Sequence, residues 1–148
     1  MKNILAKLLV FATFTIFLAS CTKDEDPAPA SPSIVGKWTI IKTVVTVPGS
    51  PAQTEPYTGN EPGCNKDFVE FISGGVVNNI EYSKVNNLCV PSTDGAVWAQ
   101  TGNNLKITDG SNITNFTIET LTATDLVLKG TESSGGTTAT FVISFSRI

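Results

Sequence analysis

Residues 138–148 read Thr-Ala-Thr-Phe-Val-Ile-Ser-Phe-Ser-Arg-Ile, and their character alternates from one residue to the next. Phe141, Ile143, Phe145 and Arg147 share one face of an extended chain, whereas valine and serine occupy the opposite face. Period-two alternation over this length predicts a β-strand with one apolar face. We expect that face to point toward a core.

Short runs of the same kind recur about every dozen residues along the chain, and helical periodicity is hard to find. Turn residues separate them, as at Gly74-Gly75, where glycine accepts the positive φ of a tight turn. A proline-rich polar stretch at 48–63 is expected to end the first run and to separate it from the second. Residues 130–136 are glycine-rich. The predicted strands span residues 34–47, 67–73, 76–85, 96–100, 105–108, 113–121, 125–129 and 138–148.

The sequence therefore predicts an all-β fold of about eight antiparallel strands in meander order. Such a sheet, with one continuous apolar face, removes its exposed edges most simply by closing into a barrel. Phe116 and Ile118 are expected to face inward, as are Leu126 and Leu128. An open sandwich is the alternative architecture.

The N-terminal segment differs in character from the rest of the chain. Two lysines precede an apolar run at residues 8–18, which ends in Leu18-Ala19-Ser20-Cys21. This order of charged, apolar and small residues resembles the signal peptide and lipobox of bacterial lipoproteins. A transmembrane anchor is the alternative, but the run has only about 11 residues, whereas a span needs about 20. The resemblance implies that residues 1–20 are removed and that Cys21 carries the acyl chains of a membrane anchor.

Residues 21–32 form a polar, proline-rich segment that cannot bury a core and is expected to act as an extended tether. Its cluster Lys23, Asp24, Glu25 and Asp26 resembles the export signal that sends Bacteroidetes lipoproteins to the outer face of the outer membrane. The alternative is that these charges only keep the tether solvated. We expect a lipid-anchored protein of the bacterial outer membrane that faces the cell exterior.

Residues 33–148 have the length of one ordinary domain. Their seven basic and ten acidic side chains are scattered, without a basic stripe that would fit a nucleic acid. We expect a monomer that binds neither nucleic acid nor a cofactor.

Cys64 and Cys89 are the cysteines that remain once Cys21 is lipidated. Export places them in an oxidising compartment, where an even pair predicts a disulfide rather than a metal or redox site. Two free buried thiols are the alternative.

Histidine is absent from the chain, which excludes Ser-His-Asp and Cys-His catalysis and any histidine-ligated metal site. The candidate acid–base pairs are Asp67 with Glu70 and Glu61 with Asp94. Residues three apart on a regular strand point to opposite faces, so the first pair cannot act together. Solvated surface carboxylates explain these residues better, and the clustered oxygen ligands of a calcium loop are missing. The sequence therefore predicts no catalytic residue and no metal site.

Gly36-Lys37-Trp38 opens the first predicted strand and resembles the Gly-x-Trp signature of the lipocalins. The resemblance extends to the small lipocalin-like lipoprotein domain of bacteria and covers nearly all of residues 33–148. In that family a late arginine lies across the signature tryptophan and closes one end of the barrel. Arg147 matches by position and face, although a solvated arginine is the alternative. Further matching positions are Ile34–Trp38, Cys64, Asp67, Phe68, Phe71, Cys89, Gly95–Trp98, Leu105, Ile107, Leu121 and Leu126–Leu128.

The resemblance implies a membrane-anchored, lipocalin-like barrel that binds a small hydrophobic ligand without catalysis. The alternative is a surface-displayed interaction domain with a filled core, which binds a protein or a glycan through its loops. The two functions differ in whether the barrel has an unfilled interior. The residues that we expect to line a ligand cavity are Phe68, Trp98, Phe116, Ile118, Phe141, Ile143 and Phe145.

Overall fold

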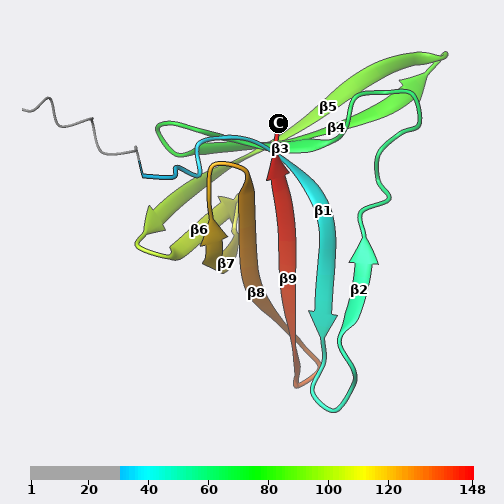
Figure 1. Ribbon diagram of the computed structural model, residues 1–148. Helices are drawn as coiled ribbons and strands as arrows, with labels where there is room; N and C mark the ends of the chain where they lie inside the picture. The colour runs from blue at the N-terminus through cyan, green and yellow to red at the C-terminus, as the bar shows by residue number, and fades with distance from the viewer. Residues whose placement is uncertain (1–30) are drawn as a thin grey trace, which may run out of the picture. The chain divides into compact units, whose positions relative to one another are not determined.

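Nine antiparallel strands make up residues 31–148, the part of the chain that the computed structural model describes (Figure 1). The predicted signal peptide, Cys21 and the acidic segment 23–26 lie outside the described residues. The strands are β1 (Gly36–Thr46), β2 (Gln53–Pro56), β3 (Phe68–Ile72), β4 (Val76–Val85), β5 (Leu88–Thr101), β6 (Asn104–Asp109), β7 (Asn112–Leu121), β8 (Asp125–Ser134) and β9 (Thr137–Arg147).

Eight of these strands close into a barrel. From β3 to β9 each strand pairs with the next, and β9 pairs back onto β1. The other edge of β1 is shared, because residues 36–38 pair with β3 and residues 42–45 pair with β2. The predicted all-β, eight-stranded antiparallel barrel is confirmed, and pairing of the last strand with the first rules out the open sandwich.

Three differences from the predicted strands exceed two residues. β2 lies inside the stretch 48–63, where the sequence predicts a break, and all four of its residues are exposed, so no apolar alternation reveals it. β5 begins at Leu88 rather than at residue 96, because its polar first half is held only by the ladder to β4. β8 continues through Gly130, which is buried because the Phe141 ring occupies the space that a Cβ would need.

The apolar core gathers at one end of the barrel, which we call the closed end. Trp38 and Leu126 have no exposed surface, and Phe71 and Leu105 are 1% exposed. The Trp38 indole N–H donates a hydrogen bond of 2.7 Å to the Ile34 carbonyl, so its polar atom is satisfied inside the core. The remaining core members are Ile34, Val77, Ile118, Leu128 and Phe145.

Arg147 joins the last strand to the first at this closed end. It pairs with Trp38 in the ladder, and its guanidinium carbon lies 4.2 Å from the centre of the indole ring. The same guanidinium donates hydrogen bonds to the carbonyls of Val35 (3.0 Å) and Ser33 (2.6 Å). Gly36 has a φ of 135° and lies where any Cβ would meet the guanidinium. The chain therefore requires glycine two residues before the tryptophan.

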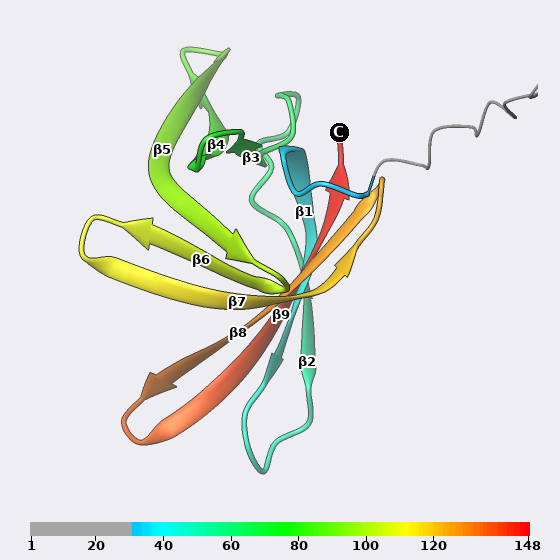
Figure 2. The same ribbon diagram turned by 90° about the vertical axis from the view of Figure 1, so that its left-hand side faces the viewer.

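Away from the closed end the hairpins β4–β5, β6–β7 and β8–β9 fan out in different directions (Figure 2), and we call this splayed side the open end. The ladder between β5 and β6 begins only at Val97, although β5 starts nine residues earlier. The ladder between β7 and β8 stops at Phe116 and Gly130. The hairpin β4–β5 therefore diverges from β6–β7, and β6–β7 diverges from β8–β9.

Trp38→Ala should lower the free energy of unfolding by about 3 to 5 kcal/mol, because the indole is fully buried. Arg147→Ala should cost less, and a double-mutant cycle from chemical denaturation should give a coupling above about 0.5 kcal/mol. Arg147→Lys is the matched control, since it keeps the charge but loses the planar group that stacks on the ring. Strictly additive losses would show that the stacked pair contributes no interaction energy.

Candidate functional site

An apolar cleft opens on the inner face of the sheet toward the open end. Residues of four consecutive strands, β3 to β6, line it. Its volume is about 310 Å³. We call it the interior cleft. It is lined by Val69, Val77, Asn79, Asp94, Gly95, Ala96, Ile107 and Asp109.

Strand register explains why these side chains converge. Val69 pairs with Asn79, and Asn79 pairs with Asp94, so the three form one row across β3, β4 and β5. Val77 and Ala96 form the next row toward the closed end. Apolar walls thus give way to polar groups at the outer rim of the cleft. Such a pattern can hold an apolar body and contact its polar end.

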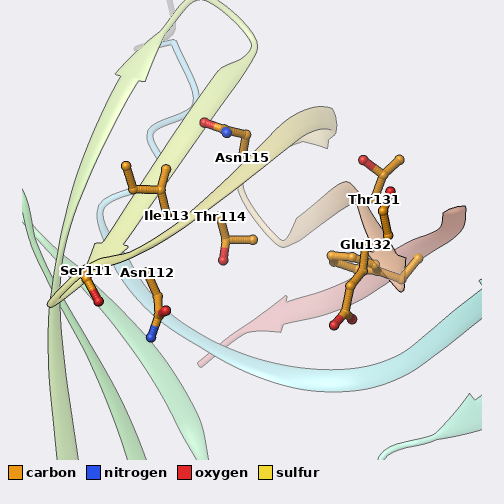
Figure 3. Close-up of a pocket in the computed structure, with 9 residues that line it drawn as sticks. Ser111, Asn112, Ile113, Thr114, Asn115, Thr131 and Glu132 are labelled. Carbon is orange, nitrogen blue, oxygen red and sulfur yellow. The ribbon is translucent and has the colours of Figure 1, made fainter. Parts of the chain in front are cut away.

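A second and larger space lies where β7 and β8 diverge. This β7–β8 slot has a volume of about 630 Å³. Figure 3 shows Asn112 and Thr114 of β7 on one side of the slot and Thr131 and Glu132 of β8 on the other. Ser111, Ile113, Asn115, Ser133 and Phe141 complete its lining.

The slot is polar at its mouth and aromatic at its inner limit. The Phe141 ring packs edge-on against Phe116, with 5.8 Å between the ring centres. Gly130 lies beneath the Phe141 ring and leaves room for it. This aromatic pair therefore separates the slot from the apolar core.

The residues that sequence reasoning assigned to a cavity are distributed among three environments. Ile118 and Phe145 are buried members of the core, and Trp98, Phe116 and Ile143 pack against that core. Phe141 lines the β7–β8 slot. The seventh residue, Phe68, lies on the opposite face of β3 from Val69 and Phe71, with the Lys37 ammonium 4.9 Å from its ring centre. Phe68 therefore faces away from the interior, in contrast to the expectation.

Trp98 lies beside the interior cleft without lining it. Its indole N–H is shared between the carbonyls of Val76 (2.9 Å) and Ile72 (3.1 Å), and its ring packs edge-on against Phe71. Trp98 pairs in the ladder with Ile107, a wall residue of the cleft. Its fluorescence is therefore a natural reporter of occupancy.

Sequence reasoning missed the walls of the interior cleft. Val69, Val77, Ala96 and Ile107 are small or aliphatic, and the expectation centred on aromatic residues. A usable signal was present, because Val69 shares its strand face with the buried Phe71, whereas Phe68 does not. The sequence predicts for Asp94 only a possible pairing with Glu61, and not its place in the lining of the cleft.

The candidate acid–base carboxylates all have structural or ionic roles except Asp94. Asp67 is 5% exposed, and its carboxylate accepts hydrogen bonds from the Tyr57 hydroxyl (2.8 Å) and the Tyr82 backbone N–H (2.7 Å). Glu70 pairs with Lys37 and Glu61 with Lys84, each at 3.9 Å. The contacts of Asp67 with Tyr82 and of Glu61 with Lys84 position the loop before β3 against the β4–β5 hairpin, and the pair of Glu70 with Lys37 links β3 to β1.

The hydrogen bond between Tyr57 and Asp67 alters the acidity of the phenol. Burial, followed by this hydrogen bond and the negative charges of Asp67 and Glu81, raises the pKa of Tyr57 from 10.0 to about 12. A raised pKa in the folded state stabilises the protein below pH 10, and that contribution is lost as the pH rises toward about 12. The contact is therefore intact at neutral pH.

Cys64 and Cys89 form a disulfide, as the sequence predicts. The bridge joins the loop before β3 to the first half of β5, the part of that strand that pairs only with β4. It therefore links the β4–β5 hairpin covalently to the loop before β3.

The described residues offer neither a membrane-spanning helix nor a metal cluster. No helix within residues 31–148 is long and apolar enough to cross a bilayer. No three metal-ligating side chains gather in that same part of the chain.

Replacing both Cys64 and Cys89 by alanine should lower the free energy of unfolding by about 3 kcal/mol, because the bridge spans 25 residues of sequence. Changing both residues avoids leaving a reactive thiol. Chemical denaturation of the double variant and of the reduced wild type should give the same loss. Equal stability of the oxidised and reduced wild type would mean that the bridge does not stabilise the fold.

Several solved lipocalin structures resemble this barrel. The complex of bovine odorant-binding protein with undecanal has 18% identity and a TM-score of 0.44, and the match covers 80% of this chain and 76% of that one. The possum milk whey lipocalin trichosurin with bound 4-ethylphenol has 13% identity and a TM-score of 0.41, covering 75% and 73%. A dog lipocalin allergen has 17% identity and a TM-score of 0.41, covering 78% and 74%.

The family assignment rests on sequence. No curated protein matches the chain. Residues 34–128 match the lipocalin-like domain family, and this match includes more than half of the chain. It extends from the segment before β1 to Leu128 in β8, through the Gly-x-Trp residues and all four strands around the interior cleft. The chain therefore belongs to the lipocalin-like domain family.

Proposed function

We propose that this protein is a lipid-anchored binding protein that holds a small hydrophobic molecule in its interior cleft without transforming it. The apolar lining of the cleft carries this proposal. Val69, Val77, Ala96 and Ile107 form its walls, on the inner face of a barrel that Trp38 and its neighbours fill at the other end. An apolar molecule gains affinity there by removing its own surface and these walls from water.

Binding without turnover is supported by the chemistry of the side chains. The chain contains no histidine, and Asp67, Glu70 and Glu61 are each engaged in hydrogen bonds or ion pairs. Of the four candidate acid–base residues, Asp94 lines the interior cleft, but Glu61, its candidate partner, lies outside the lining, so the pair cannot act together on a bound molecule.

The anchor is proposed from the sequence. The lysines before residues 8–18, the apolar run and Leu18-Ala19-Ser20-Cys21 together support lipidation of Cys21. Two or more acyl chains hold a protein on a membrane almost permanently. The acidic segment Lys23 to Asp26 supports display on the outer surface of the outer membrane.

Ala96→Phe should abolish or strongly weaken binding of a neutral probe such as decanol, because the added ring would fill the interior cleft. Tryptophan-fluorescence titration of the purified full chain measures the effect, with Trp98 as the nearby reporter. Ala99→Phe is the matched control, since Ala99 lies on the same strand but is exposed on the opposite face. Thermal melts of both variants establish that they are folded.

Equal decanol affinity in the two folded variants would contradict binding in the interior cleft. If the wild type binds no apolar probe and no ligand copurifies from the native host in native mass spectrometry, the binding proposal fails. A surface-displayed domain that contacts proteins or glycans through its loops would then replace it.

Cells supplied with a tagged fatty acid should label the wild-type protein and not Cys21→Ser, because the thiol is the acylation site. External protease on intact cells should remove the wild-type domain, and alanine replacement of Lys23 to Asp26 should protect it. Equal labelling of both forms would overturn the anchor. A wild-type domain untouched by protease would overturn surface display.

A further inference from the structure

We propose that the interior cleft prefers hydrophobic amines, held as ammonium ions, over fatty acids and other apolar anions. This inference rests on the proposed function and names the ligand class of the same cleft. The cleft itself and its apolar walls define the site. The polar groups at its rim then determine which head group a bound amphiphile can carry.

Hydrogen-bond acceptors predominate among the side chains at the rim. Asp94 and Asp109 line the cleft directly, and a carboxylate has no N–H or O–H to donate. The Asn79 amide donates one N–H to the Glu81 carboxylate at 2.8 Å and keeps its second N–H and its oxygen. The amide oxygen adds a further acceptor to those of the two carboxylates. An ammonium head group brings three donors to this rim, whereas a carboxylate head group brings none.

The linings of the interior cleft and of the β7–β8 slot contain no positively charged side chain. Asp94 and Asp109 are the ionisable residues that line the interior cleft, and Glu132 is the one that lines the β7–β8 slot. Among residues 31–148, these three carboxylates form no ion pair within 4.0 Å, and no side-chain hydrogen bond engages them.

The ion pairs of the described chain lie elsewhere. Lys37, Lys84 and Lys129 pair with Glu70, Glu61 and Glu119, all outside the two linings. Arg147 is engaged at the closed end. The carboxylates that line the two cavities therefore have no partner cation among residues 31–148.

The rim carboxylates lie where the head group of a bound amphiphile would be placed. The row from Val69 through Asn79 to Asp94 runs from apolar wall to acidic rim, so an alkyl or aryl body in the cleft places its head group beside the carboxylates. Each exposed ion pair contributes modestly, so we expect a preference of about fivefold to tenfold for an amine over a matched carboxylate. Added salt should reduce this preference, because solvent-exposed charges are screened.

Decylamine, decanol and decanoate test the inference, since they share one alkyl chain and differ in charge. Tryptophan-fluorescence titrations of the full chain at neutral pH and low salt should give the tightest binding for decylamine and the weakest for decanoate. The double variant Asp94→Asn, Asp109→Asn should reduce the ratio of amine to carboxylate affinity to about twofold or less. Its decanol affinity should stay within about twofold of the wild type, because the apolar walls are unchanged.

The matched control is the double variant Glu55→Gln, Glu119→Gln, which changes net charge equally at residues outside both linings. It should keep the wild-type preference. If decanol binds but decylamine binds no tighter than decanoate, this inference fails while the proposed function stands. An equal loss of preference in both double variants would assign the effect to net charge and overturn the role of the rim. If none of the three probes binds, the proposed function fails as well.

Discussion

The stacking of Arg147 on Trp38 is the contact on which the closed end of the barrel depends, because it covers the core tryptophan where the last strand pairs with the first. The indole is completely buried, and the guanidinium lies 4.2 Å from its ring centre. The same guanidinium holds the carbonyls of Ser33 and Val35, so it also fixes the segment that leads into β1. One planar cation thus seals the closed end through stacking and hydrogen bonds together. Gly36 follows from this contact, since any side chain there would displace the guanidinium.

A sealed end allows the other end to remain open. Large apolar side chains fill the closed end, and the ladders between β5, β6, β7 and β8 run toward it, with one irregularity between Ile118 and Thr120. Toward the open end the hairpins diverge. Local cross-links and hydrogen bonds stabilise the β4–β5 hairpin there. The disulfide between Cys64 and Cys89 holds the β4–β5 hairpin to the loop before β3. The buried carboxylate of Asp67 adds hydrogen bonds from Tyr57 and Tyr82 to the same junction.

This division of the barrel separates the residues that fill the core from those that line the interior cleft. Residues of the core can be retained for packing, while the rim of the interior cleft varies in charge at little structural cost, because Asp94 and Asp109 are exposed. In this chain the rim is acidic, and the polar β7–β8 slot beside it carries the same sign of charge through Glu132.

Alternation along single strands was sufficient to predict much of the fold. It assigned Phe145, Ile118 and Leu126 to the core, since side-chain direction on a strand is a local property of the backbone. The pairing of Cys64 with Cys89 was also predictable from the sequence, because these are the two cysteines that remain once Cys21 is set aside as the expected lipidation site. The strand β2 and the first half of β5 escaped prediction, since both are polar and exposed and are defined by the ladders that they join.

Only the tertiary structure decided where the barrel is hollow. The ladders stop at Val97 in β5 and at Phe116 in β7, and these end points depend on the twist and register of strands far apart in the chain. The resulting cleft is lined by Val77, Ala96 and Ile107 instead of the predicted aromatic residues. The sequence by itself determined which face of each strand is apolar, because alternation is local. The tertiary structure determined which apolar positions are left uncovered, because that depends on how distant strands pair.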